Sequence, residues 1–468
     1  MMTGTPQLLE EGGPPPKARS YRGVIDPQKA RDPDYYPGLA IALPLGIQHV
    51  LAMFVSNIAP AIIIAGAAGF GFGSADTSEL IYLIQASMLF AGVATLFQTI
   101  GIGRVGARLP IVQGTSFAFL PVMIPIAAGQ GVGAMAVLMT AGFFGGLFHM
   151  VLSFFIGRIR FALTPLVTGL VVLMIGLSLM RVGVQYAAGG ASVAGTPAYG
   201  SAESWALAAI VVLTTLGLSF FGRGIFSTAS VLIGLCVGYA AAGFMGRISF
   251  DPVSTVGWFM VPDPFHYGVA ISVSAILGFC LMGVVSAIET VGDVSGICEG
   301  GAQRQATDRE LSGATFADGL GTSIAAIFGA LPNTSFSQNV GLIAITGVMS
   351  RHIVTIGALF LIVCGLAPKI GALVTTIPIE VLGGGVIVMF GMVASAALAI
   401  LSAVEWSQRN MLIFAAAISI SLGLQLEPDA VQHLPETLRT LLTSGVLPAA
   451  GIAIVLNLVV PGRTSGAR

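Results

Sequence analysis

From Leu331 to Gly347 the chain reads LPNTSFSQNVGLIAITG, a polar interruption between apolar stretches. An earlier stretch, from Leu109 to Phe117, reads LPIVQGTSF and has the same plan, a Leu-Pro pair followed shortly by Thr-Ser-Phe. Proline interrupts helices, and glycine weakens them. We therefore expect a helix break at corresponding points in the two halves of the chain.

The two breaks belong to a longer internal repeat. A second pair of blocks, in the same order, reads GLVVLMIG from Gly169 and GGVIVMFG from Gly384. The Thr-Ser-Phe blocks begin 219 positions apart and the glycine-bounded blocks 215 apart. The repeat unit is about half of the chain, or seven membrane spans. Because seven is an odd number, the second copy lies upside down in the bilayer. Inverted repeats are typical of secondary transporters, whose substrate sites lie where helices break at the membrane midplane.

The composition indicates a membrane protein. Of the 468 residues, 55% are hydrophobic and 9% are charged, whereas soluble domains average about 25% charged residues. The net charge of −1 gives no sign of a nucleic-acid partner. The spacing of the four cysteines fits no metal site, so we interpret them as apolar filler.

Fourteen apolar stretches approach the length of about 20 residues that a membrane helix needs. They cover residues 38–66, 79–101, 109–128, 131–156, 161–180, 204–221, 225–246, 268–296, 311–329, 334–347, 352–373, 378–403, 409–425 and 438–460. The third contains Pro110, Gly114 and Pro121, and the tenth is too short for one straight crossing. These two spans hold the expected breaks.

The loop charges test this division. With the N-terminus in the cytoplasm, sixteen Lys and Arg residues fall inside and four fall outside, namely Arg181, Arg247, Lys369 and Arg439. Such an excess obeys the positive-inside rule. We predict that both termini are cytoplasmic. Residues 1–37 contain three consecutive prolines and mixed charge, so we expect a disordered tail there.

Ionisable residues inside membrane spans are expensive and are functional candidates. Glu289 and Asp293 lie four residues apart in span eight, on one helix face. Asp293 is either functional itself, a supporting partner, or a carboxylate near the surface. Asp318, in span nine, is either functional or caps a helix end beside Gly319. We interpret His49, in span one, as a hydrogen-bonding group between helices.

Glu289 stands deep in an apolar run and can both carry a proton and accept hydrogen bonds from ring N–H groups. Gln338 and Asn339, in span ten, offer donors and acceptors. A planar heterocycle with alternating N–H and C=O groups matches this set. Phe117 and Phe336, in the two breaks, supply a possible apolar wall.

The segment QNVGLIAITG, from Gln338 to Gly347, resembles the signature of the nucleobase–ascorbate transporter family. That signature is Gln, Glu or Pro, then Asn, any residue, Gly, four of any kind, Thr, and Arg, Lys or Gly. Three further motifs resemble the family: QHVLAMF from Gln48, ETVGD from Glu289, and Asp318-Gly319. The stretch LPNTSFS before Gln338 does so too, and the resemblance covers residues 38–460.

The resemblance implies an all-α membrane protein of fourteen spans in two inverted repeats. Its core domain would comprise spans one to four and eight to eleven, and its gate domain spans five to seven and twelve to fourteen. Spans three and ten would each hold a short strand before a half-helix. The corresponding segments are 1–37 (tail), 38–156 (core), 161–246 (gate), 268–373 (core), 378–460 (gate) and 461–468 (tail). Family members are often dimers through the gate domain.

The resemblance also implies roles for these residues. Glu289 and Gln338 would hold the base, with Phe117 packing on it, and Asp293 and Asp318 would matter for function. We add Ser116, Asn339 and Phe336 as binding candidates, assign proton coupling to Glu289, Asp293 and Asp318, and give His49 a structural role. We expect no metal and no cofactor beyond a co-transported proton, although the sequence does not distinguish a proton from sodium.

We therefore predict a symporter for a purine nucleobase, xanthine or uric acid, in the cell membrane. Family members that carry uracil usually have glutamate at the position of Gln338 and histidine at that of Asp293, whereas xanthine and uric acid members usually have the Gln-Asn pair and the aspartate found here. We therefore favour a purine and keep uracil as the alternative. A channel, and an anion transporter of the same architecture, are the other classes considered. The sequence contains no catalytic motif that favours an enzyme.

Overall fold

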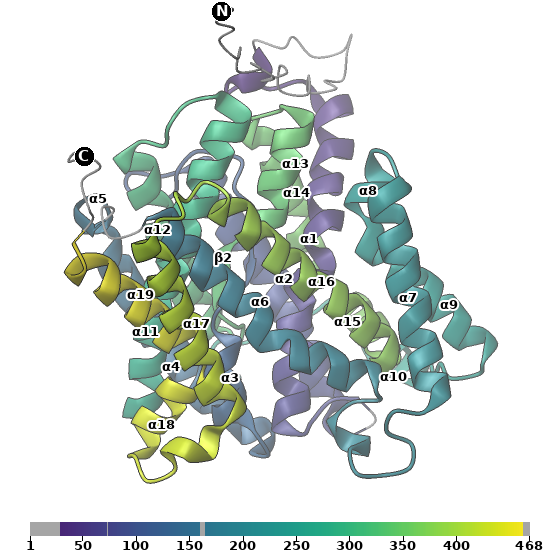
Figure 1. The fold of residues 1–468 in the computed structure, drawn as a ribbon. Helices are drawn as coiled ribbons and strands as arrows, with labels where there is room; N and C mark the ends of the chain where they lie inside the picture. The colour runs from purple at the N-terminus through teal and green to yellow at the C-terminus, as the bar shows by residue number, and fades with distance from the viewer. Residues whose placement is uncertain (1–28, 73, 160–163, 462–468) are drawn as a thin grey trace, which may run out of the picture.

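The computed structural model describes residues 29–72, 74–159 and 164–461, which form a mostly helical molecule (Figure 1). The first half contains η1 (Lys29–Arg31), α1 (Leu39–Ala68), α2 (Thr77–Ile100), β1 (Gln113–Thr115), α3 (Leu120–Ala127), η2 (Gly131–Gly133), α4 (Ala134–Ser153), α5 (Ile156–Ile159), α6 (Pro165–Ala187), η4 (Ala191–Val193), α7 (Ala202–Phe221), α8 (Ile225–Thr228) and α9 (Ser230–Phe244). The second half contains α10 (Asp251–Thr255), α11 (Val273–Ile297), η5 (Cys298–Ala302), α12 (Asp308–Ile327), β2 (Asn333–Ser335), α13 (Ser337–Thr346), α14 (Arg351–Gly365), α15 (Pro368–Thr375), α16 (Ile379–Leu401), α17 (Gln408–Leu426), η6 (Pro428–Val431), α18 (Glu436–Thr443) and α19 (Val446–Val459).

Both expected breaks are present, each as a three-residue strand followed by a short helix. β1 precedes α3, and β2 precedes α13. The strands pair antiparallel, with Gly114 opposite Thr334. Gly114 allows a close approach, because a Cβ at this position would lie 1.9 Å from Cε2 of Phe336. The two segments that interrupt the apolar pattern therefore meet in the middle of the fold.

Each strand is fixed by a threonine from a neighbouring helix. Oγ1 of Thr95, in α2, accepts the backbone N–H of Gln113 at 2.9 Å. Oγ1 of Thr322, in α12, accepts the backbone N–H of Asn333 at 3.0 Å. The first residue of each strand thus has the same kind of anchor, which satisfies a buried backbone donor.

Helix length does not reproduce the expected fourteen spans. Among the described residues, eight helices are long and apolar enough to cross a membrane, or nine if α14 and α15 form one span bent by 76°. α13 has 10 residues, α19 has 14 and α9 has 15. These elements are too short to span about 30 Å of hydrocarbon as single straight helices.

The long helices pack into two groups. In the first helix group (α1–α4 and α11–α15), α4 packs on α11 and α12, and α14 packs on α1 and α2. In the second helix group (α6–α9 and α16–α19), α16 packs on α6, α7 and α9, and α19 packs on α6 and α17. Fewer contacts join the two groups, so a seam runs between them.

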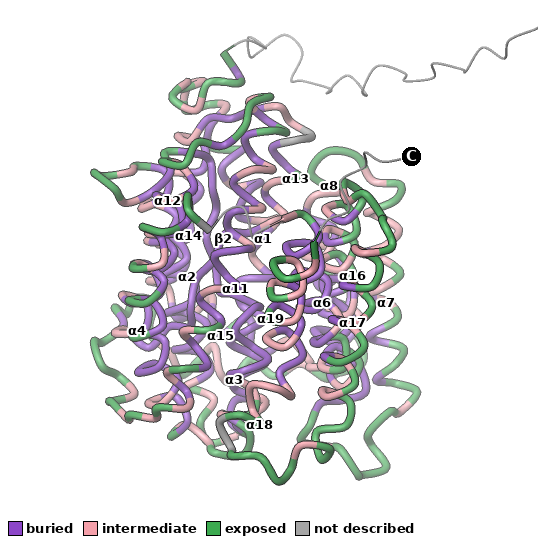
Figure 2. Tube along the Cα trace, turned by 60° about the vertical axis from the view of Figure 1, so that its left-hand side comes forward, coloured by how far each residue is buried: buried purple, intermediate pink, exposed green. Residues whose placement is uncertain are grey.

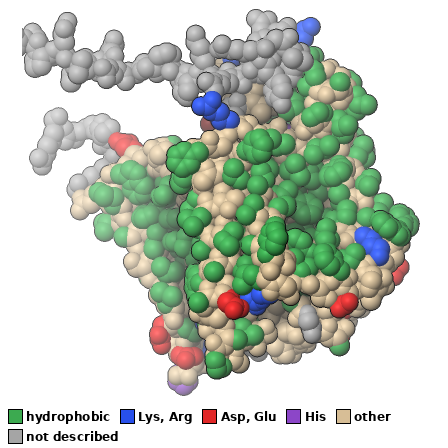
Figure 3. All heavy atoms as spheres, turned by 90° about the vertical axis from the view of Figure 1, so that its right-hand side faces the viewer, with side chains coloured by type: hydrophobic (Ala, Val, Ile, Leu, Met, Phe, Trp, Pro, Cys, Tyr) green, Lys and Arg blue, Asp and Glu red, His purple; other side chains and the backbone are tan. Residues whose placement is uncertain are grey.

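The outer helices present apolar side chains. In the most apolar part of α2, 83% of the residues are buried, against 17% in α17 (Figure 2). Figure 3 shows a broad apolar face on which the few charged side chains lie near the top and in the lower half. Because the upper middle of this face shows no charged side chain, we infer that it contacts lipid.

Part of the segment that we expected to be a disordered N-terminal tail is ordered. Residues 1–28 and 462–468, and residues 161–163 of the expected gate segment, lie outside the described residues. Residues 29–37, which we expected to be disordered, are ordered against the start of α14. The backbone N–H of Met349 donates to Ala30 O at 2.7 Å, and Arg351 Nε pairs with Asp34 Oδ1 at 2.5 Å. The charges in this segment thus tie it to the fold.

Candidate binding site between the two helix groups

A cavity of about 330 Å³ lies on the seam, beside both broken spans. Its lining from the first helix group consists of Leu51, Ala52, Val55, Ser56, Phe117, Glu289, Thr334, Phe336, Ser337, Gln338, Gly341 and Leu342. Its lining from the second helix group consists of Val172, Ile175, Ser219, Ser227, Thr228, Val231, Leu232, Met389, Met392, Val393 and Ala396. The first group supplies the carboxylate and the amide, and the second a mostly apolar wall. Mostly apolar pockets with a few polar groups are typical of small-molecule sites.

Glu289 is the single ionisable residue among the described residues that line this cavity. It lies in α11, and its Oε2 is buried without a hydrogen-bond partner in the described part of the chain. A buried carboxylate oxygen without a partner is costly. Glu289 is therefore an open hydrogen-bonding position at the wall of the cavity.

Gln338 lies in the first turn of α13, across the cavity from the second helix group. Its Nε2 donates to Ser56 Oγ at 3.4 Å, and Ser56 Oγ donates to Met389 Sδ at 3.3 Å. These are long contacts to weak partners, so a ligand with a better acceptor can replace them. The first turn of a helix also leaves backbone N–H groups without helical acceptors.

Aromatic rings from the two breaks complete the lining. Phe117 follows β1 and Phe336 follows β2, and both face the cavity. Phe117 also packs edge-on against Phe390 of α16, with ring centroids 5.4 Å apart. This edge-on contact holds the ring in place beside the cavity.

Asp293 does not line the cavity but supports residues that do. It is buried, and its two carboxylate oxygens accept hydrogen bonds from Ser335 Oγ and Ser337 Oγ, each at 2.6 Å. It is thus not a carboxylate near the surface. By bonding on both sides of Phe336, Asp293 fixes the turn between β2 and α13.

Asp318 lies behind both strands, fully buried in the interior of α12. It does not cap a helix end. Gln98 Nε2 donates to its Oδ1 at 2.8 Å, Gln113 Nε2 donates to the same oxygen, and Thr290 Oγ1 donates to Oδ2. The carboxylate therefore joins α2, β1, α11 and α12 at one point.

Asn339 and Ser116 also lie outside the cavity lining. Asn339 Nδ2 lies 2.9 Å from Nδ1 of His49 and donates to the His49 carbonyl oxygen at 3.2 Å. This contact ties α13 to α1, so His49 joins two helices. Ser116 is fully buried, and its backbone N–H donates to Pro332 O at 2.8 Å. These residues hold the backbone on which Gln338 and Phe117 are placed.

Sequence reasoning missed several polar residues that build this site. Ser56 and Thr334 line the cavity, Asn57 holds β1, and Gln98 and Gln113 hold Asp318. The available signal was an amide or hydroxyl group in an apolar span, because such groups seek partners on other helices. Among the described residues, no group of three or more His, Cys, Asp or Glu side chains is placed to hold a metal ion.

The chain is similar in sequence to known permeases over most of its length. The model of a family described as "Permease family" (Xan_ur_permease) matches residues 40–429. The xanthine permease XanP of Escherichia coli (strain K12) is 37% identical over 436 residues, which cover 91% of this chain and 93% of that protein. The uric acid permease PucJ of Bacillus subtilis (strain 168) is 36% identical over 421 residues, 88% of this chain and 91% of that protein.

Solved structures share the fold at low sequence identity. The structure of SLC26A9 aligns with a TM-score of 0.58 at 13% identity and covers 90% of this chain and 66% of that one. At this identity the similarity concerns the fold alone. It shows that the arrangement of helices described above occurs in another solved structure.

Proposed function

Since this chain belongs to the nucleobase–ascorbate transporter family and is a transporter rather than an enzyme, we propose that it carries xanthine or uric acid together with a proton. One observation carries the proposal: Glu289, whose Oε2 has no partner among the described residues, shares a cavity of about 330 Å³ with the amide of Gln338. The similarity to xanthine and uric acid permeases supports the purine class.

The cavity offers complementary groups to the edge and the face of a purine. Glu289 accepts a ring N–H, while Gln338 both donates and accepts. Phe117 packs on the ring face, an arrangement that suits planar groups. Small-molecule pockets range from about 300 to 1,000 Å³, so this cavity is at the lower end and fits one bicyclic base.

In this mechanism Glu289 links the proton to the substrate. When protonated it is neutral and donates one hydrogen bond, and when ionised it only accepts. A carrier that moves both species must bind them in one state and release both in the other. We assign this coupling to Glu289, and we place Asp293 in a positioning role through Ser335 and Ser337.

The first test is uptake of radiolabelled xanthine into proteoliposomes with an imposed proton gradient, with uric acid, uracil, guanine and hypoxanthine as competitors. We expect accumulation that collapses when the proton gradient is removed and is indifferent to sodium. Competition by uracil alone would instead identify the pyrimidine alternative, and a conductance without saturation would identify a channel.

The coupling role is tested with Glu289→Gln, which keeps the shape but does not titrate. We expect it to abolish accumulation against a gradient while some binding survives. Glu405→Gln, at an exposed position after α16, is the matched control and should accumulate as wild type does. Full accumulation by Glu289→Gln, with unchanged pH dependence, would move the proton to Asp293 or Asp318.

We further propose fourteen spans in two inverted repeats, with both termini in the cytoplasm, and we propose that the first and second helix groups act as core and gate. The sixteen-to-four distribution of Lys and Arg supports the orientation. The antiparallel pairing of β1 with β2 supports the inversion, as do the matching anchors Thr95 and Thr322.

The orientation is tested by labelling single cysteines in a variant without the native ones. A cysteine at Gln432 should react with an impermeant reagent from outside the cell, and one at Gln305 should not. The reverse pattern would reject the topology. The homodimer implied by the resemblance stays a prediction, which cross-linking across the second helix group in membranes would test.

A further inference from the structure

A second cavity, of about 380 Å³, lies on the same seam, at the ends of α1, α3, α6 and α17 that are remote from the N-terminus (Figure 1). Its lining consists of Ile63, Gly66, Ala67, Pro121, Ile124, Pro125, Ala128, Ser178, Leu179, Arg181, Val182, Gln185, Tyr186, Ala191, Gln425 and Thr443. In the proposed topology this end faces outside. The first cavity instead includes residues of α8 and α13, near the N-terminal end.

Several polar atoms of this lining have no partner, and Arg181 is the single charged residue among the described lining residues. Arg181 is exposed and has no ion pair or hydrogen bond with any described residue. Ser178 is 8% exposed, and its Oγ has no hydrogen-bond partner in the described part of the chain. Gln425 donates to the Ser178 carbonyl oxygen at 3.3 Å, but its own Oε1 is buried without a described partner. Both oxygens lie beside Gly445, where a Cβ would lie 2.6 Å from Gln425 Oε1 and 2.7 Å from Ser178 Oγ. A ligand in the cavity can satisfy them after a rotation of these side chains.

Tyr186 separates the two cavities. It lines the second cavity, and it also lines a small void that shares Val55 with the first. Its hydroxyl donates to the carbonyl oxygen of Ile62, in α1, at 3.1 Å. The ring fits because residue 66 is glycine, since a Cβ there would lie 2.6 Å from the Tyr186 hydroxyl. Tyr186, from the second helix group, thus packs against α1 of the first group and lies between the two cavities.

We propose that the second cavity is an outer binding site that holds an anionic purine, such as deprotonated uric acid, before it passes Tyr186 to the central cavity. The inference rests on the proposed function. Arg181 supplies the charge complementary to the anion. Gln425, Gln185 and Ser178 supply hydrogen bonds to ring N–H and C=O groups, and Pro121 and Pro125 supply an apolar wall. The described lining holds no carboxylate that would repel an anion.

The proposal is tested by initial rates of uric acid uptake from outside. Arg181→Gln should raise KM about three- to tenfold at low salt with little change in maximum rate, because a single exposed charge acts mainly on capture. Arg181→Lys keeps the charge and should stay near wild type. Raising the ionic strength should increase the KM of wild type but not that of Arg181→Gln, because salt screens exposed charges.

Two controls distinguish capture of an anion from a structural role of Arg181. Uptake of neutral hypoxanthine should not respond to Arg181→Gln, and Arg439→Gln, at the same end of the molecule, should leave uric acid uptake unchanged. An unchanged KM for uric acid in Arg181→Gln would overturn the proposal. Equal effects on uric acid and hypoxanthine would also overturn it, and would assign Arg181 to structure or to a lipid headgroup. Failure of the proposed function would appear differently, as a wild-type protein that takes up no purine.

Discussion

The two broken spans share a backbone design but differ in their side chains. In each, a short strand begins at a threonine-anchored residue, and a phenylalanine that lines the cavity follows within two residues of the strand's end. The helix after β1 reads LPVMIPIA and is apolar throughout, whereas the helix after β2 begins with Ser-Gln-Asn. The first break therefore supplies shape, and the second supplies hydrogen-bonding groups.

The anchors at the strand ends show the same division. Asn57, a neutral residue of α1, accepts the backbone N–H of Thr115 at 2.9 Å. Asp293, an acid of α11, accepts from Ser335 and Ser337 at the corresponding end of β2. In this fold, the first break can therefore serve as a structural support, while the second break carries the side chains that bind the substrate.

The largest expected effect comes from the shape of the first break. Gly114→Ala places a Cβ within 1.9 Å of the Phe336 ring, and within 2.8 Å of Asn57 Oδ1. Because Asn57 is fully buried and Phe336 can move only into the binding cavity, we expect almost complete loss of folded, transport-competent protein, measured by size-exclusion chromatography and uptake. Gly391→Ala, where a Cβ meets nothing within 4 Å, should be neutral. A folded Gly114→Ala variant would show that the two breaks do not need this close approach.

The second prediction compares the two anchors. Asp293→Ala leaves two serine hydroxyls without their acceptor beside the cavity, and we expect uptake to fall by about a hundredfold or more, since charge-assisted hydrogen bonds contribute about 1.5–3 kcal/mol each. Asn57→Ala should lower the free energy of unfolding by about 1–3 kcal/mol and keep most of the transport per folded molecule. Equal losses of transport in the two variants would show that the anchor of the first break matters as much for transport as the anchor of the second.

The third prediction compares two glutamines. Gln338→Glu, in the second break, replaces a donor and acceptor by an acceptor, so the competition profile should shift away from xanthine while the protein still folds. Gln113→Glu, in the first break, sets a second carboxylate against Asp318, so we expect reduced thermal stability instead. Unchanged selectivity and affinity in Gln338→Glu would remove Gln338 from the site.

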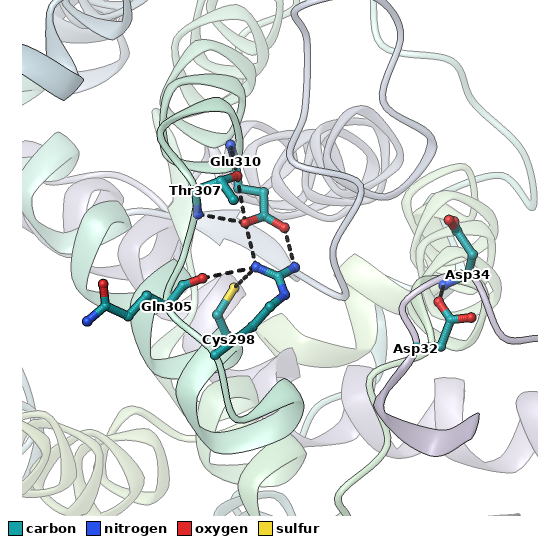
Figure 4. Close-up of polar contacts among 7 residues, drawn as sticks. Asp32, Asp34, Cys298, Gln305, Thr307 and Glu310 are labelled. Carbon is teal, nitrogen blue, oxygen red and sulfur yellow. Dashed lines mark hydrogen bonds and ion pairs between the residues drawn. The ribbon is translucent and has the colours of Figure 1, made fainter. Parts of the chain in front are cut away.

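The smallest effect concerns a carboxylate held by a cation outside the membrane spans. Arg304 donates to both Glu310 carboxylate oxygens, at 2.9 and 2.5 Å (Figure 4). Burial alone raises the pKa of Glu310, but the hydrogen bonds from Arg304 and Thr307 outweigh it and lower the pKa below 4.5. A lowered folded-state pKa adds stability above the unfolded pKa, and this stability is lost as the pH falls through the folded value.

The measurement is the melting temperature of wild type and Glu310→Gln between pH 7 and pH 3.5. Glutamine also serves in a capping box, so the variant removes the charge and keeps the helix start. We expect wild type to be more stable by less than about 1 kcal/mol at pH 7, and the difference to shrink with acidification. A difference that is constant across this range would show that the ion pair contributes nothing.

The sequence predicted the places of the breaks because proline and glycine act locally. It also identified Glu289, Gln338, Phe117 and Phe336, which the fold brings to one cavity; their role in binding stays a prediction. It did not show that Asn339 and Asp318 face other helices, because the direction of a polar side chain in an apolar helix depends on partners far away in sequence. The second cavity was not predicted either, since its lining comes from five α-helices, the 3-10 helix η4 and Ala128.

The hydrogen bonds of Asp318 also constrain how the protein is made. Gln98 and Gln113 are synthesised some 200 residues before the carboxylate that they bind, and β1 precedes its partner β2 by a similar distance. Until that carboxylate has entered the bilayer, the side-chain NH2 groups of Gln98 and Gln113 and the open edge of β1 lack these partners, a costly condition in hydrocarbon. We therefore expect the first half of the chain to stay shielded from lipid during insertion until the second half completes it.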